Sequence, residues 1–116
     1  MDPRLVRVIE RLVSEPSQRP RLPELAKEIG LSVRSLELLF ITHTGKPFAT
    51  YYRELRMGLA REMLGKTNRQ VKEVASSLGY RAVEVFCRDF QRESGCTALE
   101  YRSRIRKELL QKKSIE

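Results

Sequence analysis

Residues 73–102 read EVASSLGYRAVEVFCRDFQRESGCTALEYR, and this stretch decides how the rest of the chain is organised. Its apolar residues recur at helical spacing on both sides of a glycine. The marker residues, in order, are Val74, Ala75, Leu78, Gly79, Tyr80, Phe86, Phe90 and Gly95. They predict a short helix that ends at the first glycine, a tight turn, and a second helix that ends near the second glycine. The small alanine and the turn glycine allow the two helices to cross closely, which is typical of a helix-turn-helix.

The same pattern occurs earlier in the chain, at residues 22–45. The matching residues of this first copy are Leu25, Ala26, Gly30, Leu31, Leu36, Phe40 and Gly45. Beyond it, Tyr51 aligns with Tyr101, so each copy is expected to be closed by a further helix that bears an inward tyrosine. A pattern that occurs twice in this order predicts two helix-turn-helix units.

Short local signals place the first helices. Asp2 is a good N-cap and Pro3 suits the first helical position, so a helix is predicted to begin there. Its apolar stripe consists of Leu5, Val8, Ile9 and Leu12. Residues 15–21 contain two prolines and are predicted to form a loop. Ser32 is a good N-cap for the second helix of the first unit.

A longer helix at residues 47–64, ended by Gly65, is predicted between the two copies. It carries Tyr51, Leu55, Leu59 and Met63 at helical spacing. Gly58 lies inside this helix, where either close packing requires it or the helix is softer. Thr97 and Glu100 form a capping box that predicts a last helix to about residue 112.

The chain is therefore predicted to be all-α, with about seven helices in two helix-turn-helix subdomains joined by a linker helix. Residues 1–46 are expected to hold the N-terminal helix and the first unit. Residues 47–65 are expected to form the linker helix. Residues 66–116 are expected to hold the second unit and the C-terminal helix.

The composition favours a polyanionic partner. The 116 residues include 23 Lys and Arg against 15 Asp and Glu, for a formal net charge of +8. Nucleic acid is the commonest polyanion for a small basic domain, although a merely basic protein remains an alternative on composition alone. The absence of tryptophan argues against a broad aromatic platform for single strands.

Several other classes of protein find little support in the sequence. The two cysteines and one histidine cannot complete a four-ligand zinc site, and reduced thiols are the simpler interpretation. No apolar run approaches the roughly 20 residues of a membrane span, and the charged N-terminus is not a signal peptide. No paired carboxylates, glycine-rich loop or nucleophile with a base is evident. We therefore expect a cytoplasmic protein without enzymatic activity, cofactor or metal.

These motifs resemble the AraC/XylS family of bacterial transcription regulators. The family pattern is A, three residues, G and an aromatic residue, then F-x-R-x-F, then G-x-T-P-x-x-Y-R. The chain supplies Ala75, Gly79, Tyr80, Phe86, Arg88, Phe90, Gly95, Thr97, Tyr101 and Arg102, with Ala98 where the family usually has proline. The resemblance covers residues 22–102. It implies binding to double-stranded DNA and regulation of transcription, usually activation, through contacts with RNA polymerase.

The resemblance also implies which side chains read DNA bases: Arg34, Glu37, Leu38, Val83, Glu84, Val85 and Arg88. Arginine can bond a guanine edge, glutamate can accept a hydrogen bond from cytosine, and apolar side chains can contact thymine methyl groups. Intrahelical ion pairs between Arg34 and Glu37 and between Glu84 and Arg88 are the competing uses. Candidates for phosphate contacts, which carry no sequence information, are Ser32, Lys46, Arg53, Arg81 and Arg92.

Three residues depart from the family pattern. Leu38 stands where many relatives have arginine, and Ile41 where they usually have a basic residue. Ala82 replaces a common capping serine or aspartate, so the start of the second recognition helix is expected to fray. We hypothesise that the second unit supplies more of the electrostatic affinity, whereas the first reads mainly apolar features of the DNA.

The expected function is sequence-specific binding of double-stranded DNA in two successive major grooves. The domain is expected to be a monomer. A further domain of the full-length protein could dimerise and so make that protein dimeric. We expect the DNA-binding part of a larger ligand-responsive regulator; a complete short regulator is the alternative. A basic helical protein-interaction module is a less favoured class, which weak and salt-insensitive DNA binding would support.

Overall fold

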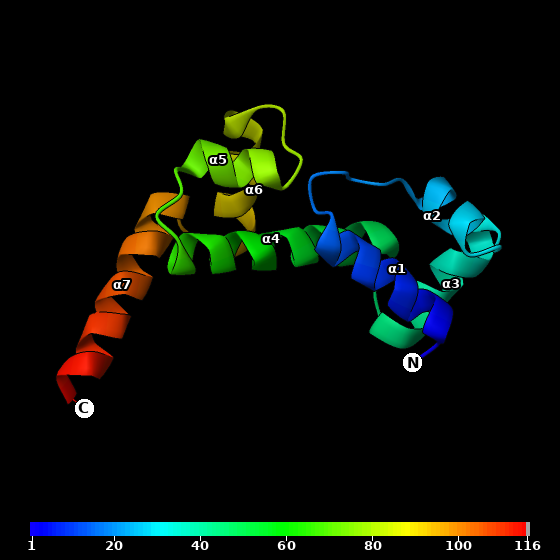
Figure 1. Ribbon diagram of the computed structural model, residues 1–116, viewed down its shortest axis with the longest axis horizontal. Helices are drawn as coiled ribbons and strands as arrows, with labels where there is room; N and C mark the ends of the chain where they lie inside the picture. Colours follow the sequence, from blue (N-terminus) through cyan, green and yellow to red (C-terminus); the bar gives the residue numbers. More distant parts are fainter. Residues whose placement is uncertain (116) are drawn as a thin grey trace. The chain divides into compact units, whose positions relative to one another are not determined.

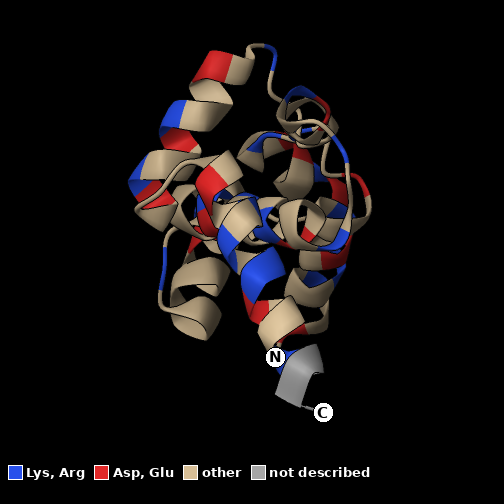
Figure 2. Ribbon diagram, turned by 90° about the vertical axis from the view of Figure 1, so that its left-hand side faces the viewer, with Lys and Arg blue, Asp and Glu red and all other residues tan. Residues whose placement is uncertain are grey.

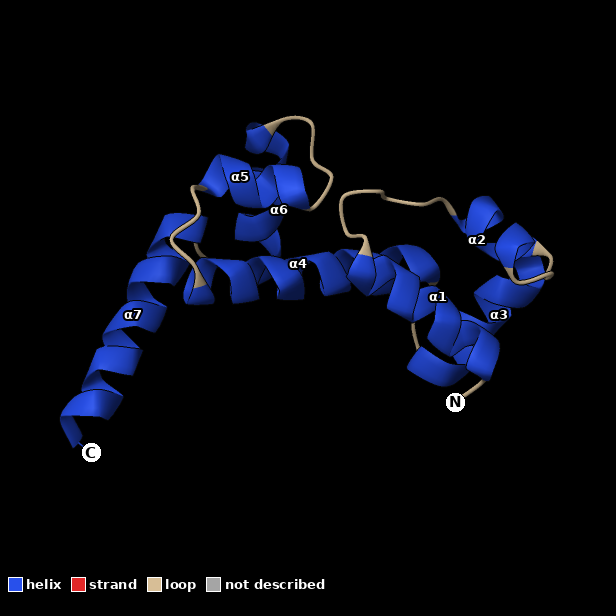
Figure 3. Cartoon of the chain, viewed as in Figure 1, coloured by secondary structure: helices blue, strands red, loops and turns tan. Residues whose placement is uncertain are grey.

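A computed structural model of the chain describes residues 1–115, with side chains through residue 112. Within these residues the chain forms seven helices and no strand, so the predicted all-α fold is confirmed (Figures 1 and 3). The helices are α1 (Pro3–Ser14), α2 (Leu22–Glu28), α3 (Val33–Thr44), α4 (Phe48–Lys66), α5 (Val71–Ser77), α6 (Val83–Ser94) and α7 (Ala98–Ile115).

The chain divides into two compact units, which we call the first unit (Met1–Arg56) and the second unit (from Met57 onward). The helix predicted as a separate linker is α4, and it belongs to both units. Its residues up to Arg56 complete the first, and its residues from Met57 belong to the second.

The first unit encloses one apolar core. The buried side chains are Leu5, Val8 and Leu12 of α1, Leu25 and Ala26 of α2, Leu36 and Phe40 of α3, and Tyr52 of α4. The predicted stripe of α1 therefore faces this core. Asp2 caps α1 by accepting the Arg4 N–H at 2.8 Å. Hydrogen bonds from the side chain and backbone of Arg4 lower the pKa of the Asp2 carboxyl to about 2.

The second unit encloses its own core, which repeats the first. The buried side chains are Met57, Ala60 and Leu64 of α4, Val74 and Ala75 of α5, Leu78, Tyr80, Phe86 and Phe90, and Ala98 of α7. The predicted inward tyrosines are found in both units. Tyr51 lies 5.4 Å from Phe40, and Tyr101 lies 5.8 Å from Phe90, measured between ring centroids.

The two helix-turn-helix turns have the same backbone geometry. In the first unit, Gly30 has φ of 71° and the Leu31 N–H donates to the Ala26 carbonyl at 2.9 Å. In the second, Gly79 has φ of 84° and the Tyr80 N–H donates to the Ala75 carbonyl at 3.0 Å. A residue with positive φ is needed to end a helix in this way, and glycine adopts that conformation without steric cost. The glycine and alanine shared by both copies therefore mark the turn.

Helix α4 differs from the prediction in its end and in its buried face. It continues through Gly65 to Lys66. A Cβ atom at Gly65 would lie 3.4 Å from Ile105 Cγ2, an ordinary contact, so Gly65 neither ends the helix nor is required by the packing of α7. Tyr51, Leu55, Leu59 and Met63 are only half-buried, while a neighbouring stripe that includes Met57 is buried. The buried stripe differs from the predicted one because α4 packs against two different cores along its length.

Two further features of the helices concern Gly58 of α4 and the two ends of α7. A Cβ atom at Gly58 would meet only the Arg61 Nη2 atom, at 3.9 Å, so close packing does not require a glycine there. The predicted capping box at the start of α7 is formed, with Thr97 and Glu100 exchanging hydrogen bonds of 3.1 Å. Helix α7 runs to Ile115, three residues beyond the predicted end.

Two arginines of α7 hold the C-terminal end of α4. Arg102 donates from Nε to the Leu64 carbonyl at 2.9 Å and from Nη2 to the Arg69 carbonyl. Arg106 donates to the Thr67 carbonyl at 3.4 Å and to the Asn68 side chain. The last carbonyls of a helix lack partners within it, so these bonds satisfy acceptors that would otherwise need water. Burial, with repulsion from Arg106, lowers the pKa of Arg102.

Replacing Arg102 by alanine is expected to lower the free energy of unfolding of the second unit by about 1–2 kcal/mol, because charged hydrogen bonds to two carbonyls are lost. Arg102→Lys should recover only part of this, since an ammonium cannot match the guanidinium fork. Chemical denaturation would measure both variants, with Lys107→Ala as the control at an exposed position of α7. A loss no larger than that of the control would show that the two bonds do not stabilise the fold.

Candidate nucleic-acid interface

Helices α3 and α6 are the second helices of the two turns, and each buries one side. In α3, Leu36 and Phe40 are fully buried. Its first turn is capped as predicted, because the Ser32 hydroxyl accepts the Ser35 N–H at 3.1 Å. In α6, Phe86 and Phe90 are fully buried. The opposite side of each helix is exposed, as a helix that enters a major groove requires.

The start of α6 is held differently. Ala82 gives no side-chain cap, in agreement with the sequence. The Tyr80 hydroxyl donates to Asp89 Oδ2 at 2.9 Å and so ties the turn to the second turn of α6. Asp89 also pairs with Arg92 at 3.1 Å. Sequence reasoning missed this tie, although an aspartate three residues after a core phenylalanine was a visible polar residue near the buried face.

Five of the seven predicted base-reading residues lie exposed on these helices: Arg34, Leu38, Glu84, Val85 and Arg88. Neither competing ion pair is formed: within the described part of the chain, the side chains of Arg34 and Arg88 make no hydrogen bond or ion pair. Val83 is half-buried and packs against the core of the second unit. Glu37 is half-buried and has a different partner.

Glu37 connects the recognition helix of the first unit to α4. Its carboxylate accepts the Phe48 N–H at 3.1 Å. Phe48 is the first residue of α4, where backbone N–H groups lack partners and the helix dipole favours a negative charge. Pro47, the residue before α4, has no side chain that could cap this helix. In the sequence, that was the signal that a residue from elsewhere in the chain caps it. Glu37 is therefore a capping residue in this structure.

Glu37→Ala is expected to lower the free energy of unfolding of the first unit by about 1 kcal/mol, the typical effect of losing an N-terminal cap. Glu37→Gln keeps an acceptor oxygen and should lose less. Thermal denaturation followed by circular dichroism would measure both. An unchanged stability together with an altered base preference would instead assign Glu37 to DNA reading.

The candidates for phosphate contacts occupy varied positions. Arg81 is exposed in the turn before α6, and Arg53 is half-buried on α4. Arg92 is 57% exposed at its side chain while paired with Asp89 and Glu93. Ser32 uses its hydroxyl as a cap. Basic and acidic residues are interspersed along the chain (Figure 2), and pairing with acidic residues competes with phosphate binding at Arg92.

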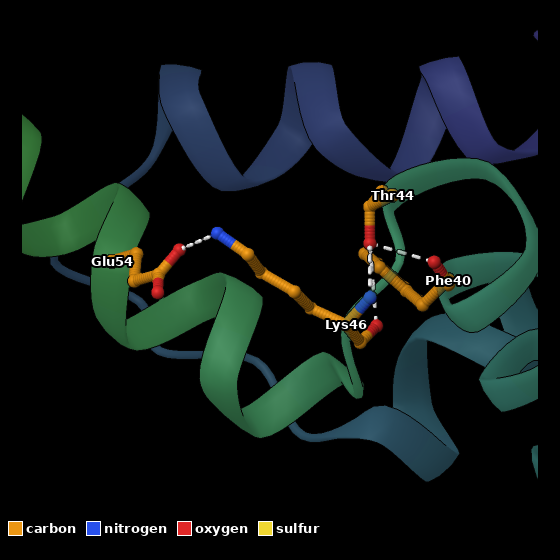
Figure 4. Close-up of polar contacts among 4 residues, drawn as sticks. All are labelled: Phe40, Thr44, Lys46 and Glu54. Atoms are coloured by element: carbon orange, nitrogen blue, oxygen red, sulfur yellow. Dashed lines mark hydrogen bonds and ion pairs between the residues drawn. The ribbon is translucent and has the colours of Figure 1, made fainter.

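Lys46 lies in a short segment with a fixed backbone (Figure 4). The Thr44 hydroxyl donates to the Phe40 carbonyl at 2.6 Å and accepts the Lys46 N–H at 3.2 Å. The Lys46 ammonium pairs with Glu54 of α4. Both partners are about 45% exposed at their side chains, so this pair is worth little and can open to phosphate.

Other kinds of site are not evident in the described residues. They contain no group of three or more side chains able to hold a metal ion. None of the described helices combines the length and the apolarity needed to cross a bilayer.

Two helix-turn-helix units, each with an exposed second helix, define a DNA-binding domain. The chain belongs to the family of AraC-type helix-turn-helix transcription regulators. A family model described as "Helix-turn-helix domain" matches residues 25–104. The recognition of the family from the sequence is therefore confirmed.

Curated relatives agree with this assignment. The chain is 32% identical over 106 residues to the "RCS-specific HTH-type transcriptional activator RclR" of Escherichia coli, covering 91% of this chain and 37% of that protein. It is 33% identical over 98 residues to "Regulatory protein SoxS" of Salmonella typhimurium, covering 84% of this chain and 92% of that protein. The first of these relatives is named a transcriptional activator and the second a regulatory protein.

Solved structures share the fold. The DNA-binding domain of AdpA in complex with a target DNA superposes with a TM-score of 0.82 at 24% identity, over 93% of this chain and 96% of that one. An AraC-type regulator from Chromobacterium violaceum gives a TM-score of 0.81 at 24% identity, over 89% of this chain and 92% of that one.

Proposed function

We propose that the chain binds double-stranded DNA sequence-specifically, with α3 and α6 in successive major grooves, and that it activates transcription. The observation that carries this proposal is the repeated turn. The same hydrogen bond, from the residue after the glycine to the buried alanine, orients an exposed second helix in each unit. One recognition helix per groove, about one DNA turn apart, would let a single chain read an asymmetric site.

Base contacts are assigned to the exposed side chains of the two helices. Arg34 and Leu38 serve α3, and Glu84, Val85 and Arg88 serve α6. Val83 packs against the core and Glu37 caps α4, so the base contacts proposed for these two side chains compete with structural contacts. Arg81, Arg92, Arg53, Lys46 and Ser32 are proposed to contact phosphates, which fix the register of the protein on the duplex.

Regulation is proposed to act through contacts with RNA polymerase, with the domain binding as a monomer in the cytoplasm. Support for activation comes from the name of RclR, which is called a transcriptional activator. The chain spans 37% of RclR but 92% of SoxS. The relatives therefore include both a longer and a short regulator. We propose that this chain is the DNA-binding part of a larger ligand-responsive regulator.

Methylation interference at guanine N7 tests the groove assignment on any duplex that the protein selects. N7 lies in the major groove, where its methylation blocks a recognition helix. Two clusters of interfering guanines on one face of the duplex, about 10 base pairs apart, are expected. A single cluster on a duplex whose two half-sites both contain guanine would contradict the two-groove proposal. Weak binding that does not change with salt would favour a protein-interaction module.

A further inference from the structure

Two exposed apolar side chains, Leu38 and Ile41, lie on the side of α3 that faces away from the core. On a helix with roughly 100° per residue, Leu38 lies almost opposite the direction of the buried Leu36 and Phe40. Leu38 is 53% exposed, and Ile41, near it on the same side, is 46% exposed. Both residues lie outside the core cluster of the first unit.

The matching positions of α6 are polar. Counting from the shared Phe40 and Phe90, Leu38 corresponds to Arg88 and Ile41 to Gln91. Arg34 corresponds to Glu84. The carboxylate that could have made α3 more polar belongs to Glu37, which is held by the Phe48 N–H. The two helices therefore present different chemistry from equivalent places in equivalent turns.

The apolar group of a base pair in the major groove is the C5-methyl group of thymine. Leu38 and Ile41 are three residues apart, about 4.5 Å along the helix axis. Neighbouring base pairs are separated by about 3.4 Å along the duplex. Two side chains with this spacing can therefore contact methyl groups on neighbouring base pairs.

We propose that α3 selects a thymine-rich half-site through apolar contacts of Leu38 and Ile41 with thymine methyl groups, whereas α6 selects its half-site mainly through hydrogen bonds of Glu84 and Arg88. This inference rests on the proposed function and specifies the DNA that the first unit takes. It adds Ile41 to the residues that determine specificity.

Deoxyuridine tests the proposal directly, because it differs from thymidine only in the missing methyl group. The experiment uses a duplex that the protein itself selects. The half-site of α3 is identified as the one whose base preference changes in the variant Leu38→Ala. Each thymine read there is expected to lose about fourfold in affinity when replaced by deoxyuridine, a factor equivalent to about 0.8 kcal/mol for one buried carbon. Each of the variants Leu38→Ala and Ile41→Ala should lose the sensitivity to deoxyuridine at one position. There, the variant should bind the thymine duplex and the deoxyuridine duplex equally well.

The controls separate methyl reading from general effects. Leu99→Ala removes a 65% exposed leucine of α7, outside both turns, and should keep the full sensitivity to deoxyuridine. Deoxyuridine placed outside both half-sites should leave the affinity of the wild-type chain unchanged. Both α3 substitutions introduce a good helix former at an exposed site, and circular dichroism would verify the fold.

Specific binding that is insensitive to deoxyuridine throughout the α3 half-site would overturn the inference while leaving the proposed function intact. A deoxyuridine effect that persists unchanged in both α3 variants would also overturn it, because other atoms would then contact the methyl groups. The absence of any preferred duplex is a different result. It would overturn the proposed function itself and the inference with it.

Discussion

Phe90→Ala is expected to lower the free energy of unfolding of the second unit by about 3–5 kcal/mol, which is enough to unfold it under native conditions. Phe90 is fully buried, and its ring lies 5.9 Å from Phe86 and 5.8 Å from Tyr101 between centroids. Removing it leaves a cavity where α6 and α7 meet. Because α6 is positioned by this core, specific DNA binding should be lost together with the fold.

Amide hydrogen exchange would measure the effect in each unit separately. Amides of α5, α6 and α7 should lose protection, whereas those of α1, α2 and α3 should keep it, because the two core clusters share no residue. Phe40→Ala is the matched control and should produce the opposite pattern. Equal loss of protection in both units for either variant would contradict the division into two cores.

Arg88→Ala is expected to weaken specific DNA binding by about 1–3 kcal/mol, roughly five- to 150-fold, and to relax the preference at one base pair. Arg88 is exposed on α6 at the position equivalent to Leu38, and it has no ion pair or hydrogen bond within the described residues. Within the described residues, no partner therefore competes with a guanine edge for the guanidinium of Arg88. Fluorescence anisotropy against duplexes that vary one base pair at a time would measure both effects.

Two variants separate base reading from charge. Arg7→Ala removes the same charge from an exposed position of α1, outside both turns, and should leave affinity nearly unchanged. Arg92→Ala should weaken binding to all duplexes alike and reduce the salt dependence by about one charge. Arg34→Ala should lose less affinity than Arg88→Ala on the same site. The reverse order would contradict the larger electrostatic share assigned to the second unit.

Much of the fold could be predicted because its signals are local. The glycine of each turn needs a positive φ, the phenylalanines recur at helical spacing, and Ser32 and Thr97 cap the helices that follow them. These features depend on residues within a few positions of one another. The repeat added strength, since the same local solution occurs twice.

Contacts between distant residues could not be predicted in the same way. Glu37 finds the N-terminus of α4, Tyr80 reaches Asp89, and Arg102 reaches the C-terminal end of α4. Each depends on how helices pack, which helical periodicity alone does not specify. For the same reason the buried stripe of α4 was displaced from the predicted residues. Two predicted base-reading residues, Glu37 and Val83, proved to have structural contacts for this reason.

Selection of binding sites from a random duplex pool at physiological salt tests whether each unit reads its own DNA sequence. Two short enriched motifs about 10 base pairs apart are expected, one for α3 and one for α6. A single motif would mean that one unit holds only the DNA backbone. Binding without any enrichment would contradict the claim, because only non-specific electrostatic affinity would then be left.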